Sequence, residues 1–310
     1  MTIHRPFRRA WLSLLGLPAL LLLTSVPAAA AAGAQPPPAP TAVAAATNCS
    51  PLPLDRKDFP DRPKIDNKFL PYVPGTQFHL DGSVILADGK PHPHRIETTV
   101  TDLTKVIDGV RTMVIFDVDI QDKKVIESEL FFVAQDSDGT VWTFGEYPEE
   151  HSPGKPVVAP RTWISGVDGA RAGIAMLAQP RVGTPTFLQG LAPKVQFKDC
   201  ATVFKTGQHT CVPLKCYNDV LVTDEFAPFD PEGGHQRKFF APGVGNIRVA
   251  AAGGVDPEAL QLTKAAKLCP AEFAKVRDQA LKQDHRGYTV AKDVYGKTPP
   301  AKQTLYAQTC

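Results

Sequence analysis

The residues with the clearest potential for chemistry are carboxylates on two neighbouring predicted strands. Asp117 and Asp119 alternate along one strand, and Glu127 and Glu129 alternate along its partner. Across an antiparallel pair, such side chains can approach one another closely. Two carboxyl groups held in this way can hydrolyse a glycosidic bond. The four acids are therefore catalytic candidates for an extracellular hydrolase of a cell-wall or polymeric substrate. The alternative is that they form the solvent-exposed face of an amphipathic sheet.

Two histidines have a spacing that suits a metal ion. His92 and His94 are alternate residues, and on a strand both imidazoles could reach one metal. Pro91 and Pro93 instead predict a loop, and no third ligand can be identified, so a solvated loop is the alternative. The Asp-Ser-Asp-Gly sequence at 136–139 could open a calcium loop, but apolar residues follow and a hairpin turn explains it. No motif predicts a cofactor, and we expect none.

Aromatic residues gather around one predicted hairpin. Because strand side chains alternate between two faces, some of these rings must point away from the core. An exposed aromatic face could hold an apolar ligand or a partner, and the candidates are Trp142, Phe144 and Trp163. The alternative is an ordinary core between a curved sheet and whatever covers it.

The first residues predict export. Arg5, Arg8 and Arg9 precede an apolar run of about sixteen residues and a block of alanines, the order found in a cleaved secretory signal peptide. We expect a leader over residues 1–34, no transmembrane span after its removal, and a disordered Pro/Ala linker over residues 35–48. Loss of three arginines changes the net charge from +2 to about −1, which leaves no basic surface for nucleic acid. The predicted location is secreted, or at least extracytoplasmic.

The six cysteines form an even set in an exported chain, which predicts three disulfides. Cys269–Cys310 would fix the C-terminus to the body of the protein. A hairpin could bring Cys200 to Cys211, and Cys49 would then pair with Cys216 by elimination.

Period-two patterning predicts a mainly β fold. Residues 95–147 read as a four-stranded meander, with turns at Asp108-Gly109 and Asp138-Gly139. We expect an irregular lead-in over residues 49–68 and a single β-rich domain over 69–310. That domain would be a curved antiparallel sheet, as a meander, half-barrel or sandwich. One amphipathic helix is expected at about 270–284, ended by Gly287, before a disulfide-held tail.

Three phrases resemble a family of exported bacterial β-rich proteins and lipoproteins of unknown function. They are FLPYVPGTQF at 69–78, AQDSDGTVWTFGE at 134–146 and FFAPGVG at 239–245, in the family's order. The resemblance covers about residues 69–250 and implies a β-rich fold and an extracytoplasmic location. It implies no activity. This chain differs in its cysteine-rich segment at 200–216 and in lacking a lipidation cysteine.

Together these features favour a secreted, non-catalytic protein that binds an apolar small molecule, a lipid or an envelope partner. The acid pairs keep the hydrolase as an alternative, and a structural surface protein is a further one.

Overall fold

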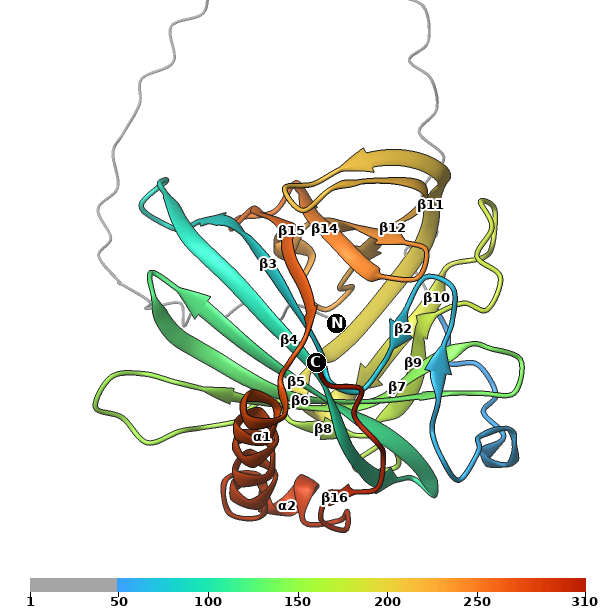
Figure 1. The fold of residues 1–310 in the computed structure, drawn as a ribbon, viewed down its shortest axis with the longest axis vertical. Helices are drawn as coiled ribbons and strands as arrows, with labels where there is room; N and C mark the ends of the chain where they lie inside the picture. The colour runs from blue at the N-terminus through green and yellow to red at the C-terminus, as the bar shows by residue number, and fades with distance from the viewer. Residues whose placement is uncertain (1–48) are drawn as a thin grey trace, which may run out of the picture. The chain divides into compact units, whose positions relative to one another are not determined.

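The computed structural model describes residues 49–310, and the predicted leader and linker lie outside the described residues. Within that part of the chain, twelve antiparallel strands form a closed ring (Figure 1). Strand β4 pairs with β3 on one side and with β5 on the other, which closes the ring. The fold is thus mainly β, as predicted, with the curved sheet closed into a barrel.

The strands of the ring follow one another in space in an order that differs from their order in the chain. In spatial order they are β4 (Pro91–Ile107), β3 (Thr76–Ile85), β15 (Glu258–Lys267), β14 (Gly245–Ala252), β13 (His235–Ala241), β12 (Cys216–Phe226), β11 (Phe197–Cys211), β10 (Phe187–Ala192), β9 (Arg171–Met176), β7 (Val141–Glu150), β6 (Lys124–Gln135) and β5 (Val110–Gln121). The short strands are β1 (Ile65–Asp66), β2 (Pro71–Tyr72), β8 (Trp163–Ile164) and β16 (Lys302–Gln303).

The predicted meander is confirmed as strands β4 to β7. Asp108 and Gly109 both have positive φ, 49° and 79°, as a tight hairpin turn requires. The turn between β5 and β6 uses the same backbone region at Asp122 and Lys123, with φ of 50° and 64°. Neither residue is a glycine or an asparagine, so this turn has a much weaker sequence pattern than the first.

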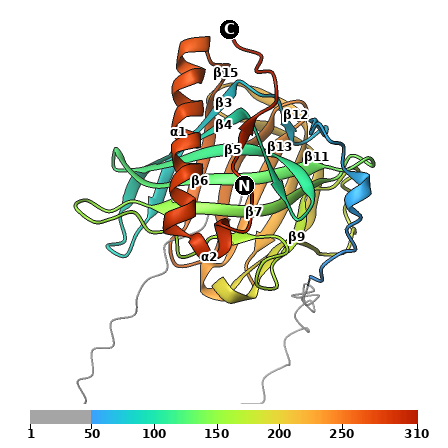
Figure 2. The same cartoon turned by 90° about the horizontal axis from the view of Figure 1, so that it is seen from below.

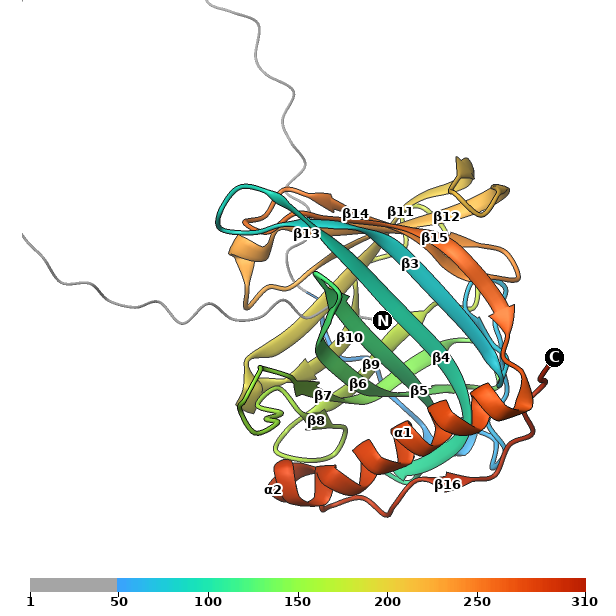
Figure 3. The same ribbon diagram turned by 60° about the vertical axis from the view of Figure 1, so that its left-hand side comes forward.

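A C-terminal helix covers the outside of this meander. Helix α1 (Pro270–Val290) lies across β4 to β7, and the short helix α2 (Lys292–Tyr295) follows it (Figures 2 and 3). The Tyr295 ring lies 4.6 Å from the Tyr147 ring and 6.3 Å from the Phe132 ring, measured between centroids. Both faces of the meander are therefore buried over part of its length, which explains the apolar residues on both faces of β5.

The predicted end of the helix is wrong. Helix α1 continues through Gly287 to Val290, because this glycine serves packing and does not end the helix. A Cβ atom at position 287 would lie 2.5 Å from Cδ1 of Tyr295. Only a residue without a side chain lets the Tyr295 ring lie so close to the helix backbone.

The lead-in packs against the barrel. The Asn67 side-chain amide donates to the carbonyl oxygens of Gly139 and Leu177, at 2.9 and 3.0 Å. Phe59 makes edge-to-face contacts with Trp142 and Phe144, at centroid distances of 6.4 and 5.3 Å. These contacts fix the lead-in to the hairpin between β6 and β7.

Three disulfides are present, and one of the predicted pairs, Cys269–Cys310, is among them. The other two predictions, Cys200–Cys211 and Cys49–Cys216, are wrong, because the structure pairs Cys49 with Cys200 and Cys211 with Cys216. Cys200 and Cys211 lie on the same strand, β11, where eleven residues of extended chain span roughly 35 Å. Cys211 and Cys216 instead face each other across the β11–β12 hairpin.

The disulfides agree with the predicted location. Such bonds persist outside the cytoplasm, and the protein is extracytoplasmic. Over residues 49–310, no helix has both the length and the apolar composition needed to cross a bilayer.

Candidate functional site

A cavity lies inside the barrel. Most of its lining residues come from seven strands of the ring, β3, β4, β9, β10, β12, β13 and β14, and only the interior of the ring is shared by these strands. Its free volume is about 30 Å³. We call it the barrel cavity; it is lined by the apolar residues Leu70, Tyr72, Phe78, Leu80, Ala175, Phe240 and Val244, by Gly245, and by the polar residues Thr98, Gln189, Glu225, Lys238 and Asn246.

The basic side chain in this lining is already neutralised. Lys238 Nζ lies 2.6 Å from Glu225 Oε2, and both side chains are buried. The two residues come from neighbouring strands, β13 and β12. Glu225 also accepts a hydrogen bond of 2.8 Å from the Thr223 hydroxyl. The pair therefore contributes polarity to the cavity wall without contributing a net positive charge.

Two of the four predicted acids meet on the inner face of the barrel, beside the lining residue Thr98. Asp117 and Glu129 are register partners across β5 and β6, and each is only 5% exposed. Burial raises the pKa of Asp117 to about 6; the Thr98 hydroxyl opposes the rise, and Asp119 and Glu146 add to it. Burial, followed by the charges of Glu146, Glu127 and Asp117, raises the pKa of Glu129 well above its ordinary value. These two acids are not part of an exposed sheet face.

The other two predicted acids are engaged in ion pairs. Glu127 is bound by the Arg161 guanidinium, which also contacts Glu150 at 3.3 Å. Asp119 is bound by His94. The structure therefore separates the four acids into a buried pair, Asp117 and Glu129, and two carboxylates that are neutralised by neighbouring bases.

His94 is held between two carboxylates inside the ring. Its Nε2 contacts Asp119 on β5, and its Nδ1 lies 2.6 Å from Glu258 Oε1 on β15. Burial alone would lower the pKa of His94, but the hydrogen bonds to Asp119 and Glu258 outweigh it and raise the pKa to about 10. His94 is thus a buried imidazolium that links three strands. Glu258 was missed because nothing in its local sequence marks it.

His92 is in a different environment. Its ring contacts Asp122 at 2.8 Å and Asp88 at 3.1 Å, in the turns at the end of the barrel. The predicted loop is wrong, because residues 91–94 belong to β4. The strand tolerates Pro93, whose carbonyl oxygen accepts a hydrogen bond of 3.0 Å from Asp122 N–H. The two histidines each bind their own pair of carboxylates and do not converge on one position.

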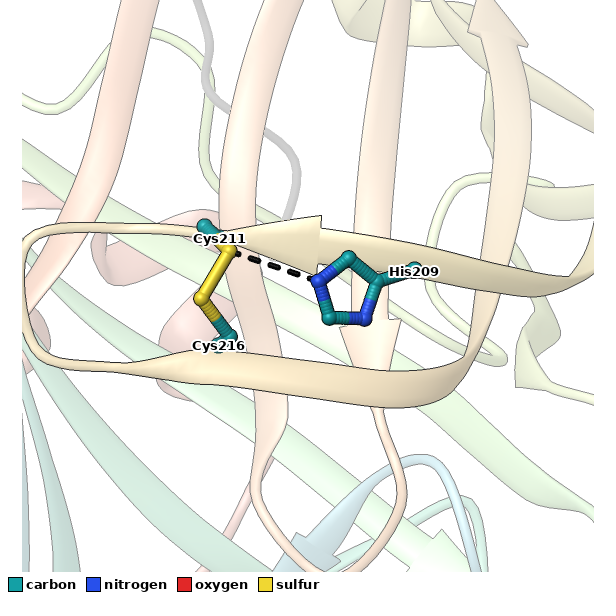
Figure 4. A group of neighbouring side chains, drawn as sticks. All are labelled: His209, Cys211 and Cys216. Atoms are coloured by element: carbon teal, nitrogen blue, oxygen red, sulfur yellow. Dashed lines mark hydrogen bonds between the residues drawn. A yellow bond between two sulfur atoms is a disulfide. The ribbon is translucent and has the colours of Figure 1, made fainter.

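The group with metal-ligand proximity in the described part of the chain is a different one. It consists of His209, Cys211 and Cys216 at the exposed end of the β11–β12 hairpin, with ligand atoms within 4.8 Å of one another. Figure 4 shows His209 beside the disulfide, with its Nε2 3.5 Å from Cys211 Sγ. The two sulfurs are bonded to each other, so they offer no thiolate to a metal.

The three predicted ligand-binding aromatics do not surround a common cavity. Phe59 covers Trp142 and Phe144, and the Trp142 indole N–H donates to Asp136 at 2.7 Å. Trp163 stacks on Phe197 at 5.1 Å and donates to Glu146 Oε2 at 2.9 Å. All three side chains are buried by neighbours from this same chain.

The cavity aromatics are others, and the sequence contains a signal for them. Tyr72 and Phe78 belong to the first phrase of the family resemblance, and Phe240 belongs to the last. The two phrases are far apart in the chain, and barrel closure brings them to one cavity. Reading the phrases as ligand contacts could have identified these rings.

No protein-family model matches the chain, and no curated protein matches it. Two solved structures are similar to it. One is described as an exported protein with a YmcC-like fold from Bacteroides fragilis NCTC 9343, at 13% identity over 65% of this chain and 100% of that chain, with a TM-score of 0.34. The other is described as a lipoprotein from Parabacteroides distasonis ATCC 8503, at 10% identity over 64% of this chain and 99% of that chain, also with a TM-score of 0.34. Neither description names a ligand.

Proposed function

We propose that this exported protein binds a small, largely apolar molecule or lipid inside its barrel and catalyses no reaction on it. The observation that supports this most directly is the composition of the barrel cavity, whose walls are mostly apolar with a few polar groups. Tyr72, Phe78 and Phe240 give it aromatic walls, and a few polar groups could orient a ligand. This combination is the usual composition of a binding pocket.

The buried acids support binding over hydrolysis of a polymer. A glycosidase that cuts a long chain needs its two carboxyl groups in an open cleft with room for the substrate. Asp117 and Glu129 are each only 5% exposed and lie within a closed ring of strands. Neither side chain faces an open cleft in which a polysaccharide or peptidoglycan strand could lie.

Filling the cavity tests the proposal. Ala175 lines it, so Ala175→Phe adds a ring to the space that the ligand would occupy. The matched control is Val255→Phe, which adds the same ring at an exposed position away from the cavity. With the uncharged fluorophore N-phenyl-1-naphthylamine as the probe, we expect the wild type and the control to bind it alike, and Ala175→Phe to bind at least about ten-fold more weakly.

Protein purified from its own host supplies the second measurement. Native mass spectrometry should detect a bound small molecule that is absent from the Ala175→Phe variant. Equal fluorophore binding by all three proteins, together with no bound mass, would reject the cavity as the binding site and favour a structural surface protein.

A further inference from the structure

We propose that the exposed end of the β11–β12 hairpin is a redox-controlled metal site, which takes Zn²⁺ or a similar thiophilic divalent cation once the Cys211–Cys216 disulfide is reduced. Its ligands are the two thiolates and the imidazole of His209. None of these residues lines the barrel cavity, so the site does not depend on the proposed function. Reduction is the switch, because the bonded sulfurs of the oxidised protein offer no thiolate.

Strand geometry places the three ligands on one outward face of the hairpin. His209 and Cys211 are alternate residues of β11, and Cys211 is the register partner of Cys216 on β12. All three residues are exposed, whereas Thr210 and Tyr217, which point to the other face, are buried. The backbone pairing of Thr210 with Tyr217 does not involve the disulfide, so we expect the ligands to stay together after reduction.

The distances between the ligand atoms suit a metal ion. The three atoms lie within 4.8 Å of one another, and His209 Nε2 lies 3.5 Å from Cys211 Sγ (Figure 4). Around a tetrahedral zinc, with bonds of about 2.3 Å to sulfur and about 2.0 Å to nitrogen, a sulfur and a nitrogen ligand are about 3.6 Å apart. The imidazole is therefore already at ligand distance from one sulfur. The two sulfurs need only separate to about 3.8 Å, which breaking their bond permits.

Asn218 orients the imidazole for metal binding. Its Oδ1 accepts a hydrogen bond of 2.7 Å from His209 Nδ1, so in the neutral ring the lone pair of Nε2 is directed at Cys211 Sγ. A ligating histidine commonly donates its other ring N–H to a carbonyl or carboxylate oxygen in this way. A bulge in the strand pairing places His209 opposite Asn218 and Asp219, and Asp219 has a positive φ of 57°. The ligand spacing and this hydrogen bond thus point independently to Nε2 as a ligand.

The other two disulfides lack this combination. Cys49–Cys200 is buried, which shields it from a soluble reductant. Cys269–Cys310 is exposed, but it has no third ligand beside it. Across residues 49–310, the group that contains His209 is the one in which three such ligand atoms come together.

Reduction of the pair requires a dithiol. One thiolate of the reductant attacks a sulfur of the Cys211–Cys216 bond, which breaks and releases the other cysteine as a thiolate. The second thiolate of the reductant attacks the resulting mixed disulfide and releases the first cysteine. The reductant leaves with an internal disulfide, and the protein has gained two electrons and two protons. Binding of the metal then releases the thiol protons to solvent.

Cobalt(II) is a suitable probe, because its thiolate complexes are coloured and those of Zn²⁺ are not. The mature protein is treated with dithiothreitol, freed of it under nitrogen, and titrated with Co²⁺ beside the untreated protein. We expect the reduced protein to bind one equivalent, with thiolate-to-cobalt charge-transfer absorption and tetrahedral d–d bands, and the oxidised protein to show neither. Zn²⁺ should displace the bound cobalt.

Variants at the imidazole test the assigned geometry while keeping every cysteine. His209→Ala should weaken Co²⁺ binding by the reduced protein at least about ten-fold, and Asn218→Leu by about 10–100-fold. Asn218→Asp should bind like the wild type, because a carboxylate accepts the same hydrogen bond. The matched control is His285→Ala, which removes an exposed histidine of α1 and should leave Co²⁺ binding unchanged.

Cysteine variants locate the metal. Cys269→Ser/Cys310→Ser should bind Co²⁺ like the wild type, and Cys211→Ser/Cys216→Ser should lose the charge-transfer absorption. A reduced wild type that binds no Co²⁺, or an oxidised one that gives the same spectrum, overturns the proposal. Survival of the absorption in Cys211→Ser/Cys216→Ser, or equal binding by His209→Ala and His285→Ala, overturns it as well. All of these outcomes leave the cavity proposal untouched.

Discussion

Lys105 Nζ lies 2.8 Å from Asp284 Oδ1, and this fully buried ion pair fixes the C-terminal helix to the barrel wall. The same ammonium donates to the Tyr288 hydroxyl and to the Pro299 carbonyl oxygen, each at 2.9 Å. It also lies 4.1 Å from the centroid of the Tyr295 ring. All three of its protons have acceptors, so the charge is stabilised despite its burial.

Removing this lysine should destabilise the protein strongly. In Lys105→Met, the carboxylate of Asp284 stays buried without its counter-ion, which costs about 3–5 kcal/mol in comparable buried pairs. Lys282→Met is the matched control, because Lys282 pairs with Asp278 on the exposed face of the same helix, and such pairs contribute at most about 1 kcal/mol. Urea unfolding followed by circular dichroism gives both values. Similar losses in the two variants would show that the buried pair has no special role.

The His94 ion pairs should make stability depend on alkaline pH. The pKa of His94 is raised to about 10 from an ordinary 6.5, because the hydrogen bonds to Asp119 and Glu258 outweigh burial. The folded state then holds a proton that the unfolded state releases, so this contribution is complete below pH 6.5 and is lost as the pH rises toward 10. His94→Gln should remove that slope, whereas His92→Gln should retain most of it. A neutral His94 imidazole in nitrogen NMR spectra at pH 8 would contradict the prediction.

Asp117 should also make stability fall as the pH rises, but in a lower pH range than His94. Its folded-state pKa of about 6 lies above the ordinary 3.8, so the folded protein binds the proton more tightly than the unfolded chain. Raising the pH through this window destabilises the unliganded protein, by about 3 kcal/mol for a shift of this size. Asp117→Asn should therefore be more stable than the wild type at neutral pH and nearly equal to it at pH 4. Parallel stability curves for the two proteins between these values would be inconsistent with a raised pKa.

The two newly assigned disulfides should contribute unequally. Cys49–Cys200 closes a separation of 151 residues, whereas Cys211–Cys216 closes one of 5. In the loop-entropy model the longer loop stabilises by about 3 kcal/mol more. Double serine replacement of each pair, compared by urea unfolding, measures the difference. Equal losses would mean that loop closure does not set their contributions, and peptide mapping of the unreduced protein checks the pairing directly.

Gly287 offers a test of helix packing. In an exposed helix interior, Gly→Ala usually stabilises by about 1 kcal/mol. Here a Cβ would lie 2.5 Å from the Tyr295 ring, so Gly287→Ala should destabilise by about 1–3 kcal/mol instead. Adding Tyr295→Leu should make the alanine substitution less harmful than it is in the wild type. A stabilised Gly287→Ala single variant would show that the ring moves aside without cost.

Local sequence was sufficient to predict the structure wherever a single short segment sets its own backbone geometry. Alternating apolar residues and the Asp108-Gly109 turn define the meander, because the positive φ of a tight hairpin is a property of the turn residues themselves. The start of helix α1 at Pro270 follows from the same kind of local preference. The even number of cysteines and the predicted leader together indicated an oxidising location, and this inference also needed no tertiary structure.

Only the tertiary structure decided the arrangement of the site, because closure of the ring joins residues that no local pattern relates. Strand pairing brings His94 near Glu258 and places Asp117 beside Thr98, and neither neighbourhood has a signal in the sequence. Placing an acid inside or outside a sheet also depends on what covers each face. Helix α1 covers the outer face of the meander, so the face that carries Asp117 and Glu129 is the interior of the barrel.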